Sequence, residues 1–191
     1  MTATFSVRRT QPTDAALLRR IRIASLVDAP YAFGARLQDV LAQPEQSFEE
    51  LAQRHSTSET STSFLLFDGP KLAGTVGAFF ELSDSHRSFI CALWVKPACR
   101  GTSAASILAL KAVEWLLHRR VQDVFAWVAN QNGKAWNFYH RLGFLPTSEI
   151  QPLPSDTSQL ETLLRLRVAE AERAIERVQL LHGRFQKTRG A

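Results

Sequence analysis

Near the N-terminus, the pattern of apolar positions changes from a period of two to the helical period. Phe5–Arg9 alternates apolar and polar side chains, as a half-buried strand does. Thr13 or Asp14 can cap a helix that runs through Leu17 toward Leu26. The chain is therefore predicted to open with a strand that is followed by a helix.

A second helical region and a polar stretch come next. Segment 28–34 is predicted to be a loop because it contains both proline and glycine. Helical patterns follow over Leu37–Leu41 and Ser47–Arg54, and the second begins with a serine whose N3 position is glutamate, as in a capping box. The polar run over residues 56–63 is predicted to be a surface loop.

Three apolar runs separated by turns form the middle of the chain. Ser63–Phe67 and Leu72–Glu81 are joined by an Asp-Gly-Pro sequence at residues 68–70, which is typical of a tight turn. Ser88–Val95 extends the same series. These runs predict an antiparallel meander of three strands.

In the second half of the chain, helical and strand patterns alternate. Leu108, Ala112, Trp115 and Leu116 fall on one helical face and predict a helix of about four turns. Interleaved helices and strands are typical of an α/β layer structure in which helices cover a mixed sheet. The other elements predicted here are a strand over Val121–Val128, a helix over Lys134–Leu142, a strand over Phe144–Ile150, a polar connection over Gln151–Ser158 and a last strand over Glu161–Val168.

The C-terminal region returns to a helical pattern. Apolar residues recur there at steps of three and four, and Gly183 lies near the predicted end of the helix. We therefore expect a main domain over residues 1–168 and a helical extension over residues 169–191. The apolar stripe allows either a homodimer or packing of the helix on its own sheet, and it is formed by Ala171, Ala174, Val178, Leu181 and Phe185.

The composition is that of one globular domain. The chain has 191 residues, of which 45% are hydrophobic and 21% are charged, so it can bury a core without metals or disulfides. The longest apolar run, Phe89–Val95, is far shorter than the ~20 residues that span a bilayer. The N-terminus lacks the apolar stretch of a secretory signal. We expect a cytoplasmic protein that does not associate with membranes.

The cysteines, the histidines and the net charge limit the kinds of ligand that the chain is expected to bind. Cys91 and Cys99 are predicted to be reduced and structural, and the histidines show no metal-ligand spacing, so no bound metal is expected. The net charge of +5 suits a polyanionic ligand, either a nucleotide or nucleic acid. Because no nucleic-acid-binding motif accompanies this charge, nucleic-acid binding ranks last among the functions considered, and no nucleic-acid partner is predicted.

One segment has the sequence of an anion-binding turn. Leu93–Leu108 predicts an apolar strand, a turn of small residues and a helix. Small side chains at Gly101, Ser103 and Ala105 would let backbone N–H groups approach a phosphate, and the helix dipole adds positive potential there. Arg100 adds a charge. A β-α corner that merely needs small residues explains this composition equally well.

A second segment places a tyrosine on the apolar face of a short helix. Within Asn130–Phe144, Tyr139 shares its helical face with Ala135 and Leu142. Its phenol can be a core group with a satisfied hydroxyl, or a proton donor at the edge of a cleft.

Taken together and in this order, the two segments resemble the GNAT family of N-acetyltransferases. That family's acetyl-coenzyme A signature is Arg/Gln-x-x-Gly-x-Gly/Ala. The matching residues are Arg100-Gly101-Thr102-Ser103-Ala104-Ala105, preceded by Val95-Lys96-Pro97, and Asn132-x-x-Ala135-x-x-Phe138-Tyr139-x-x-x-Gly143-Phe144 for the second signature. The resemblance covers residues 4–168. It implies a GNAT-like α/β fold with a central mixed, mostly antiparallel sheet of about seven strands and helices on both faces.

The resemblance implies acetyl-coenzyme A (acetyl-CoA) as co-substrate. Residues 100–105 would hold its pyrophosphate, Asn132 and Lys134 would also bind the coenzyme, and the acetyl carbonyl would accept a hydrogen bond from the backbone N–H of Leu93 or Val95. One departure is that the signature's central glycine is Ser103 here. A serine weakens binding if the site needs a positive φ, and it costs little if the backbone is helical.

The resemblance also assigns catalytic roles. Tyr139 is expected to protonate the departing thiolate. Many members use a glutamate near the fourth strand as base, but the apolar run of this strand contains no acid. The nearest candidates are Glu81, Asp84 and His86, and we select Glu81.

The acceptor pocket implied by the resemblance lies between the first helices and the last strands. Tyr31 and Phe33 are expected to line it, although aromatic residues in loops more often pack on the core. The sequence thus predicts an enzyme that moves an acetyl group from acetyl-CoA to a primary amine of a small molecule or peptide, by direct attack in a ternary complex. Ser103 and the missing acid leave a second hypothesis open, a non-catalytic acyl-CoA-binding module.

Overall fold

Seven strands form one mixed sheet in the computed structural model, which describes residues 5–81 and 87–187. The strand order is β1-β2-β3-β4-β5-β7-β6, and every neighbouring pair is antiparallel except β4 and β5, which are parallel. This confirms the predicted α/β fold with a mostly antiparallel sheet. The strands are β1 (Phe5–Arg9), β2 (Ser61–Asp68), β3 (Lys71–Phe80), β4 (Ser88–Val95), β5 (Asp123–Ala129), β6 (Leu145–Leu153) and β7 (Asp156–Arg167).

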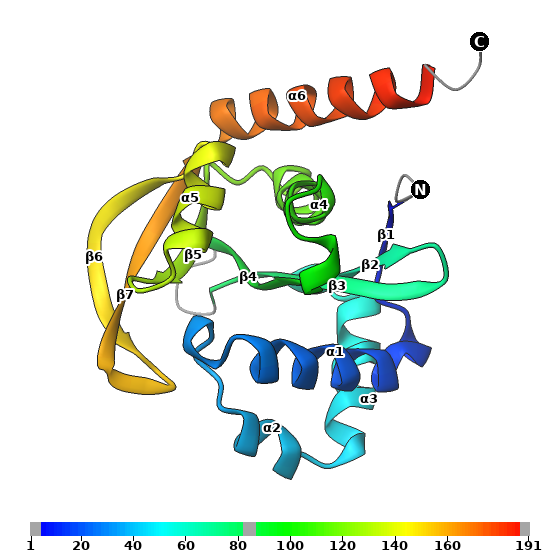
Figure 1. Ribbon diagram of the computed structural model, residues 1–191, viewed down its shortest axis with the longest axis vertical. Helices are drawn as coiled ribbons and strands as arrows, with labels where there is room; N and C mark the ends of the chain where they lie inside the picture. The colour runs from blue at the N-terminus through cyan, green and yellow to red at the C-terminus, as the bar shows by residue number, and fades with distance from the viewer. Residues whose placement is uncertain (1–4, 82–86, 188–191) are drawn as a thin grey trace.

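Helices cover both faces of the sheet (Figure 1). The first three helices lie on one side, and the last three lie on the other. They are α1 (Ala15–Asp28), α2 (Leu37–Ala42) and α3 (Glu45–Thr57), then α4 (Ala104–Leu117), α5 (Gly133–Leu142) and α6 (Val168–Lys187). Short 3-10 turns at Pro12–Asp14, Pro30–Ala32 and Pro97–Cys99 join some of these elements.

Two hydrophobic clusters, one on each side of the sheet, make up the core. Neighbouring residues of a strand point to opposite faces, so Leu66 and Val95 pack under α4 whereas Leu65 and Trp94 pack under α1 and α3. Both leucines are fully buried. The central strands therefore read as continuous apolar runs rather than alternating ones, because helices cover both of their faces.

The sheet opens between its two parallel strands. β4 and β5 pair only at Ser88 with Val124 and at Phe89 with Phe125. The closed end is held by the Ser88 hydroxyl, which donates to the carbonyl of Asp123 at 2.8 Å. Farther along β4, the register with β3 shifts, and Ala92 has a φ of 51°. A bulge of this kind bends a strand, and here β4 and β5 no longer pair beyond it.

The structure corrects two predicted boundaries in the first half of the chain. α3 begins at Glu45 after Pro44, so Ser47 lies within the first turn and does not cap the helix. The polar run 56–63 is a loop only at its centre, because Thr62 and Ser63 belong to β2 and are buried. Their hydroxyls are satisfied by tertiary hydrogen bonds, from Thr62 to the carbonyl of His55 at 2.9 Å and between Ser63 and Thr10 at 2.7 Å.

The predicted polar connection over Gln151–Ser158 is also corrected. Most of it is strand, since β6 extends to Leu153 and β7 begins at Asp156. Polar composition conceals the strand because its stability comes from cross-strand pairs, such as Gln151 opposite Glu161.

The C-terminal helix α6 packs on the rest of the chain through its first half. Ala171 and Ala174 are buried in the cluster that contains α4, and Ile175 and Val178 pack against that cluster. The side chains of Leu181 and Phe185 lie outside the described residues. Within the described ranges, no helix is both long and apolar enough to cross a membrane.

We expect a pH-dependent stability from His55, whose Nδ1 lies 2.9 Å from the Ser63 hydroxyl. Burial, with smaller contributions from Arg54 and Arg9, lowers the pKa of His55 from 6.5 to about 4. Folding therefore favours the neutral ring, and this contribution is complete above pH 6.5 and lost as the pH falls toward 4. At ~1.4 kcal/mol per pKa unit, reduced for partial exposure, the free energy of unfolding should drop by about 1–3 kcal/mol.

Urea denaturation at several pH values between 7 and 4 measures this drop. The control is His55→Gln, because an amide can still bond to Ser63 but does not titrate. Equal pH slopes in the two proteins would contradict the assignment.

Candidate active site

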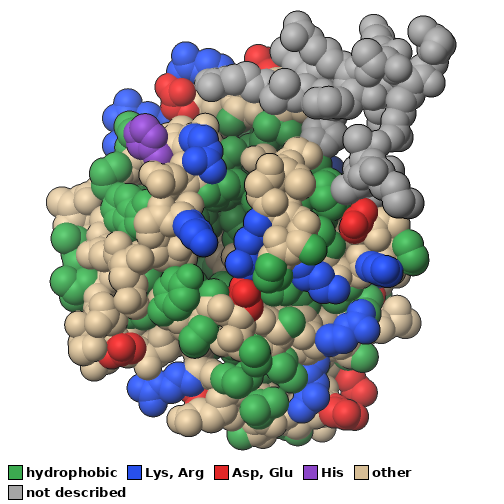
Figure 2. Space-filling view, in the orientation of Figure 1, with side chains coloured by type: hydrophobic (Ala, Val, Ile, Leu, Met, Phe, Trp, Pro, Cys, Tyr) green, Lys and Arg blue, Asp and Glu red, His purple; other side chains and the backbone are tan. Residues whose placement is uncertain are grey.

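A cavity of about 310 Å³ lies where β4 and β5 separate. α1 and the loop after it form one wall, α5 forms another, and β7 closes the far side. In the space-filling view, a hollow with a hydrophobic floor lies over the gap between α4 and α5, and basic side chains are found on its rim (Figure 2). The polar and titratable residues that line the cavity are Arg22, Cys91, Asn132, Tyr139 and Glu161.

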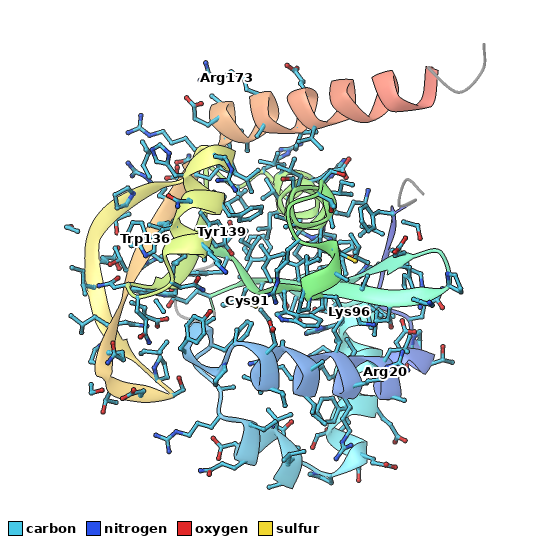
Figure 3. All side chains as sticks on the ribbon, in the orientation of Figure 1. Arg20, Cys91, Lys96, Trp136, Tyr139 and Arg173 are labelled. Carbon is cyan, nitrogen blue, oxygen red and sulfur yellow. The ribbon has the colours of Figure 1, made fainter. Side chains whose placement is uncertain are left out.

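Tyr139 projects from α5 into this region, and Cys91 on β4 lies in the same part of the molecule (Figure 3). The Tyr139 ring is only 7% exposed and packs edge-on against Phe144, with centroids 5.1 Å apart. Its hydroxyl has no hydrogen-bond partner among the described residues. Burial, aided by the neighbouring Cys91, raises the pKa of this phenol. The hydroxyl therefore stays protonated at neutral pH and can donate to a group in the cavity.

The turn before α4 presents free backbone N–H groups. Gly101 has a φ of +75°, a conformation that glycine adopts without strain. Ser103 is the N-cap residue of α4 and is helical, with a φ of −73° and a ψ of −5°. The N–H groups of Gly101, Thr102, Ser103 and Ala105 donate no hydrogen bond among the described residues, whereas that of Ala104 donates to the Thr102 hydroxyl at 3.2 Å. The helical backbone at residue 103 means that serine costs little there.

Arg100 forms an ion pair and a hydrogen bond within the protein. Its guanidinium pairs with Asp28, which ends α1, and its Nε donates to the carbonyl of Val95 at 3.1 Å. Asp28 also accepts a hydrogen bond from the Trp94 indole at 2.8 Å. Burial opposes ionisation of this carboxyl, but the hydrogen bonds from Arg100 and Trp94 and the charge of Lys134 lower its pKa. Asp28 thus ties the turn before α4 to α1.

The remaining predicted coenzyme-binding residues fall into two groups. Asn132 lines the cavity and also caps α5, because its side-chain oxygen accepts from the N–H of Ala135 at 3.1 Å. Leu93 lines the cavity as well, whereas Val95 does not and pairs with Gly74 of β3. Lys134 is exposed in the first turn of α5.

Some of the other predicted site residues lie outside the cavity. Phe33 lines the cavity, but Tyr31 is 46% exposed and lies outside it. Glu81 follows β3 and lies 3.6 Å from the guanidinium of Arg87, and it is not among the cavity-lining residues. The alternative bases Asp84 and His86 lie outside the described residues.

The two charged residues that line the cavity, Glu161 and Arg22, were not among the predicted site residues. Glu161 of β7 is 7% exposed, and its Oε1 accepts from the side-chain amide of Gln151 at 2.7 Å. Burial raises the pKa of Glu161, although this hydrogen bond opposes the shift. Arg22 of α1 also lines the cavity. The sequence signal that could have drawn attention to Glu161 is its place as the acid at the start of the predicted last strand, Glu161–Val168.

Cys91 and Cys99, both predicted to be reduced and structural, lie in different surroundings. The Cys91 side chain is open to the cavity, whereas Cys99 is buried in the core. Desolvation by the atoms packed around the sulfur raises the pKa of the Cys91 thiol to about 11, although the charge of Arg22 opposes this shift. The thiol is therefore neutral at physiological pH. Among the described residues, no group of three or more His, Cys, Asp or Glu side chains is placed to hold a metal ion.

A mixed sheet that opens between two parallel strands, beside a helix with free N–H groups, defines the fold and site of the GNAT acetyltransferases. The chain belongs to this family, because residues 28–144 match the family model described as "Acetyltransferase (GNAT) family". No curated protein sequence matches the chain.

Solved structures show the same fold. An acetyltransferase of the GNAT family from Streptococcus pneumoniae is 18% identical with a TM-score of 0.70, and the match covers 86% of this chain and 100% of that chain. Spermidine N-acetyltransferase from Vibrio cholerae, in complex with CoA and spermine, is 14% identical with a TM-score of 0.70 and coverages of 87% and 97%. Ribosomal-protein-S5-alanine acetyltransferase from Vibrio fischeri is 13% identical with a TM-score of 0.68 and coverages of 87% and 94%.

Proposed function

We propose that this protein is an N-acetyltransferase that moves an acetyl group from acetyl-CoA to a primary amine in a ternary complex. The observation that carries the proposal is the cavity at the β4–β5 opening. On the α5 side it has the phenol of Tyr139, whose hydroxyl bonds to no residue in the described part of the chain, and on the β7 side it has the buried carboxylate of Glu161. A donor and an acceptor of protons in one cavity suit a reaction in which an amine loses a proton and a thiolate gains one.

The residues present fit the coenzyme. The free N–H groups of residues 101–103 and 105, together with the N-terminal end of the α4 dipole, would bind its pyrophosphate. Acetyl-CoA, when bound, supplies the acyl thioester that the amine attacks. Backbone N–H groups near Leu93 would stabilise negative charge on the acyl oxygen, and the Tyr139 hydroxyl would donate a proton to the departing sulfur. We place these functions in the main domain, residues 1–168.

A direct assay tests the proposal. Purified protein is incubated with acetyl-CoA and a panel of amines, and both free thiol and the mass of the acetylated product are followed. Release of CoA that depends on the amine supports the transferase. The alternative, a non-catalytic acyl-CoA-binding module, predicts binding of acetyl-CoA without release for any amine.

Two carboxylates compete for the role of base, and a pair of variants separates them. The sequence favours Glu81, whereas the cavity contains Glu161. We expect Glu161→Gln to lower kcat/KM by about 100-fold, within the range measured for general acid–base groups, and Glu81→Gln to change it by less than about threefold. Steady-state kinetics on both variants checks this. A large loss of kcat/KM in Glu81→Gln but not in Glu161→Gln would identify Glu81 as the base.

A further inference from the structure

Among the residues that the structure describes, none forms an ion pair with Arg22, although Arg22 lies in the wall of the cavity. Its Nη1 is buried and makes no hydrogen bond within the described residues. Its guanidinium carbon lies 5.2 Å from the centre of the Phe33 ring, so one side of the group rests on an aromatic face. Burial lowers the pKa of Arg22, with a smaller opposing effect of Cys91. A buried guanidinium N–H without a partner is costly, unless a ligand supplies an acceptor.

Arg22 and Glu161 are the cation and the carboxylate of this cavity. Among the described lining residues, no other side chain is charged at neutral pH, because the Cys91 thiol and the Tyr139 phenol both have raised pKa values. Arg22 belongs to α1 and Glu161 to β7, so the two charges come from different elements of the cavity wall. No ion pair joins them.

The rest of the lining is apolar and largely aromatic. Phe33, Phe79, Phe89 and Trp127 all contribute to it. The cavity of about 310 Å³ must hold both the acyl end of the coenzyme and the acceptor, so it has room for a small acceptor rather than for a long chain.

We infer that the acceptor is a free amino acid with an apolar or aromatic side chain, whose carboxylate binds Arg22 and whose amino group faces Glu161. This inference rests on the proposed function and narrows its acceptor from any primary amine to a zwitterion. A polyamine offers no anion to Arg22, and its additional positive charges would be repelled by it. A peptide N-terminus lacks a free α-carboxylate beside its amine, because that carboxyl group forms the first peptide bond.

Matched substrates and variants test the inference. L-Phenylalanine and 2-phenylethylamine differ only in the carboxylate, and spermidine serves as the polyamine. We expect the protein to prefer L-phenylalanine over 2-phenylethylamine in kcat/KM by about 10-fold or more, the range for a hydrogen bond to a charged group. Arg22→Met should abolish this preference through a higher KM for L-phenylalanine, whereas Arg22→Lys should retain part of the preference.

Arg20→Met is the matched control, since Arg20 lies on the same helix but is exposed and does not line the cavity (Figure 3). L-Phenylalanine and 2-phenylethylamine differ in amine basicity. Comparing the ratio of their kcat/KM values in the wild type with the same ratio in Arg22→Met cancels this difference. The inference is overturned if spermidine or 2-phenylethylamine is acetylated as well as L-phenylalanine, or if Arg22→Met keeps the wild-type preference.

Calorimetry keeps the inference testable even without turnover. Binding of L-phenylalanine and N-acetyl-L-phenylalanine is measured in the presence of CoA, for the wild type and for Arg22→Met. Weaker binding to the variant by about 10-fold supports the inference, and equal binding or none contradicts it. If acetyl-CoA causes no thermal shift and no amine releases CoA, the proposed function itself fails. If amines are acetylated without a preference for a carboxylate, only the inference about the acceptor fails.

Discussion

Replacing Tyr139 with phenylalanine should lower kcat by about 10² to 10⁴-fold, the range for loss of a general acid. The expected loss is large because the proposed mechanism has one proton donor to the departing sulfur. Tyr139 fits this role by position, since it lines the cavity and its hydroxyl makes no hydrogen bond to the described residues. Because burial raises the pKa of its phenol, the donor form is present throughout the neutral range.

The same substitution should leave the fold and the coenzyme site intact. Phenylalanine keeps the ring that packs on Phe144, and its introduction breaks no hydrogen bond within residues 5–81 and 87–187. We expect the melting temperature to change by no more than about 1–2 °C. Tyr31→Phe is the matched substitution, because it removes the other phenol of the chain from an exposed position outside the cavity. A kcat for Tyr139→Phe close to that of the wild type would rule out Tyr139 as the acid.

Replacing Ser103 with aspartate should weaken the binding of acetyl-CoA by about 100-fold or more. Ser103 is the N-cap residue of α4, where the free N–H groups are proposed to bind the pyrophosphate. A carboxylate there would repel the phosphates with about 1–4 kcal/mol per charge pair near a protein surface. It would also accept hydrogen bonds from the N–H groups that the phosphates need.

Aspartate at this position should not destabilise the protein without ligand, because acids are favourable at helix N-termini. The measurement is a thermal melt with and without acetyl-CoA. For the wild type, ligand at 100 times its Kd adds about 2.7 kcal/mol, which corresponds to roughly 5–10 °C for a chain of this size. We expect this shift to disappear in Ser103→Asp while the melting temperature without ligand stays the same or rises.

The control for this experiment is Ser103→Gly, which restores the family signature. Because residue 103 has a helical φ of −73°, glycine should change the affinity by less than about threefold. A much tighter complex with Ser103→Gly would mean that the serine side chain itself hinders the coenzyme. An undiminished thermal shift in Ser103→Asp would place the pyrophosphate elsewhere.

Local sequence patterns predicted the parts of the site that lie within single elements. The spacing of Ala135, Tyr139 and Leu142 predicted one face of α5, and in the structure Tyr139 on that face lines the cavity. Glycine at position 101 marks the turn with positive φ. Each of these features depends on the backbone geometry of a few consecutive residues, so it can be recognised from sequence alone.

Other parts of the site depend on which elements face each other. Arg22, Cys91 and Glu161 come from α1, β4 and β7, and no pattern within those elements indicated that they line one cavity. The same limit applies to Glu81, which is close to β4 in sequence but lies beside Arg87 instead of in the cavity. Periodicity shows which residues share a face of a helix or strand, but it does not show what that face contacts.

The sequence by itself determined the family, the α/β fold, the turn before α4 and the tyrosine of α5. Only the tertiary structure decided that serine at position 103 is in a helical conformation, that Arg100 pairs with Asp28, and that a cation and a carboxylate lie in the walls of one cavity. The physical reason is that the first group follows from local backbone preferences and side-chain periodicity. The second group depends on the bulge in β4, the limited pairing of β4 with β5 and the packing of α1 beneath them, which are set by contacts between residues far apart in the chain.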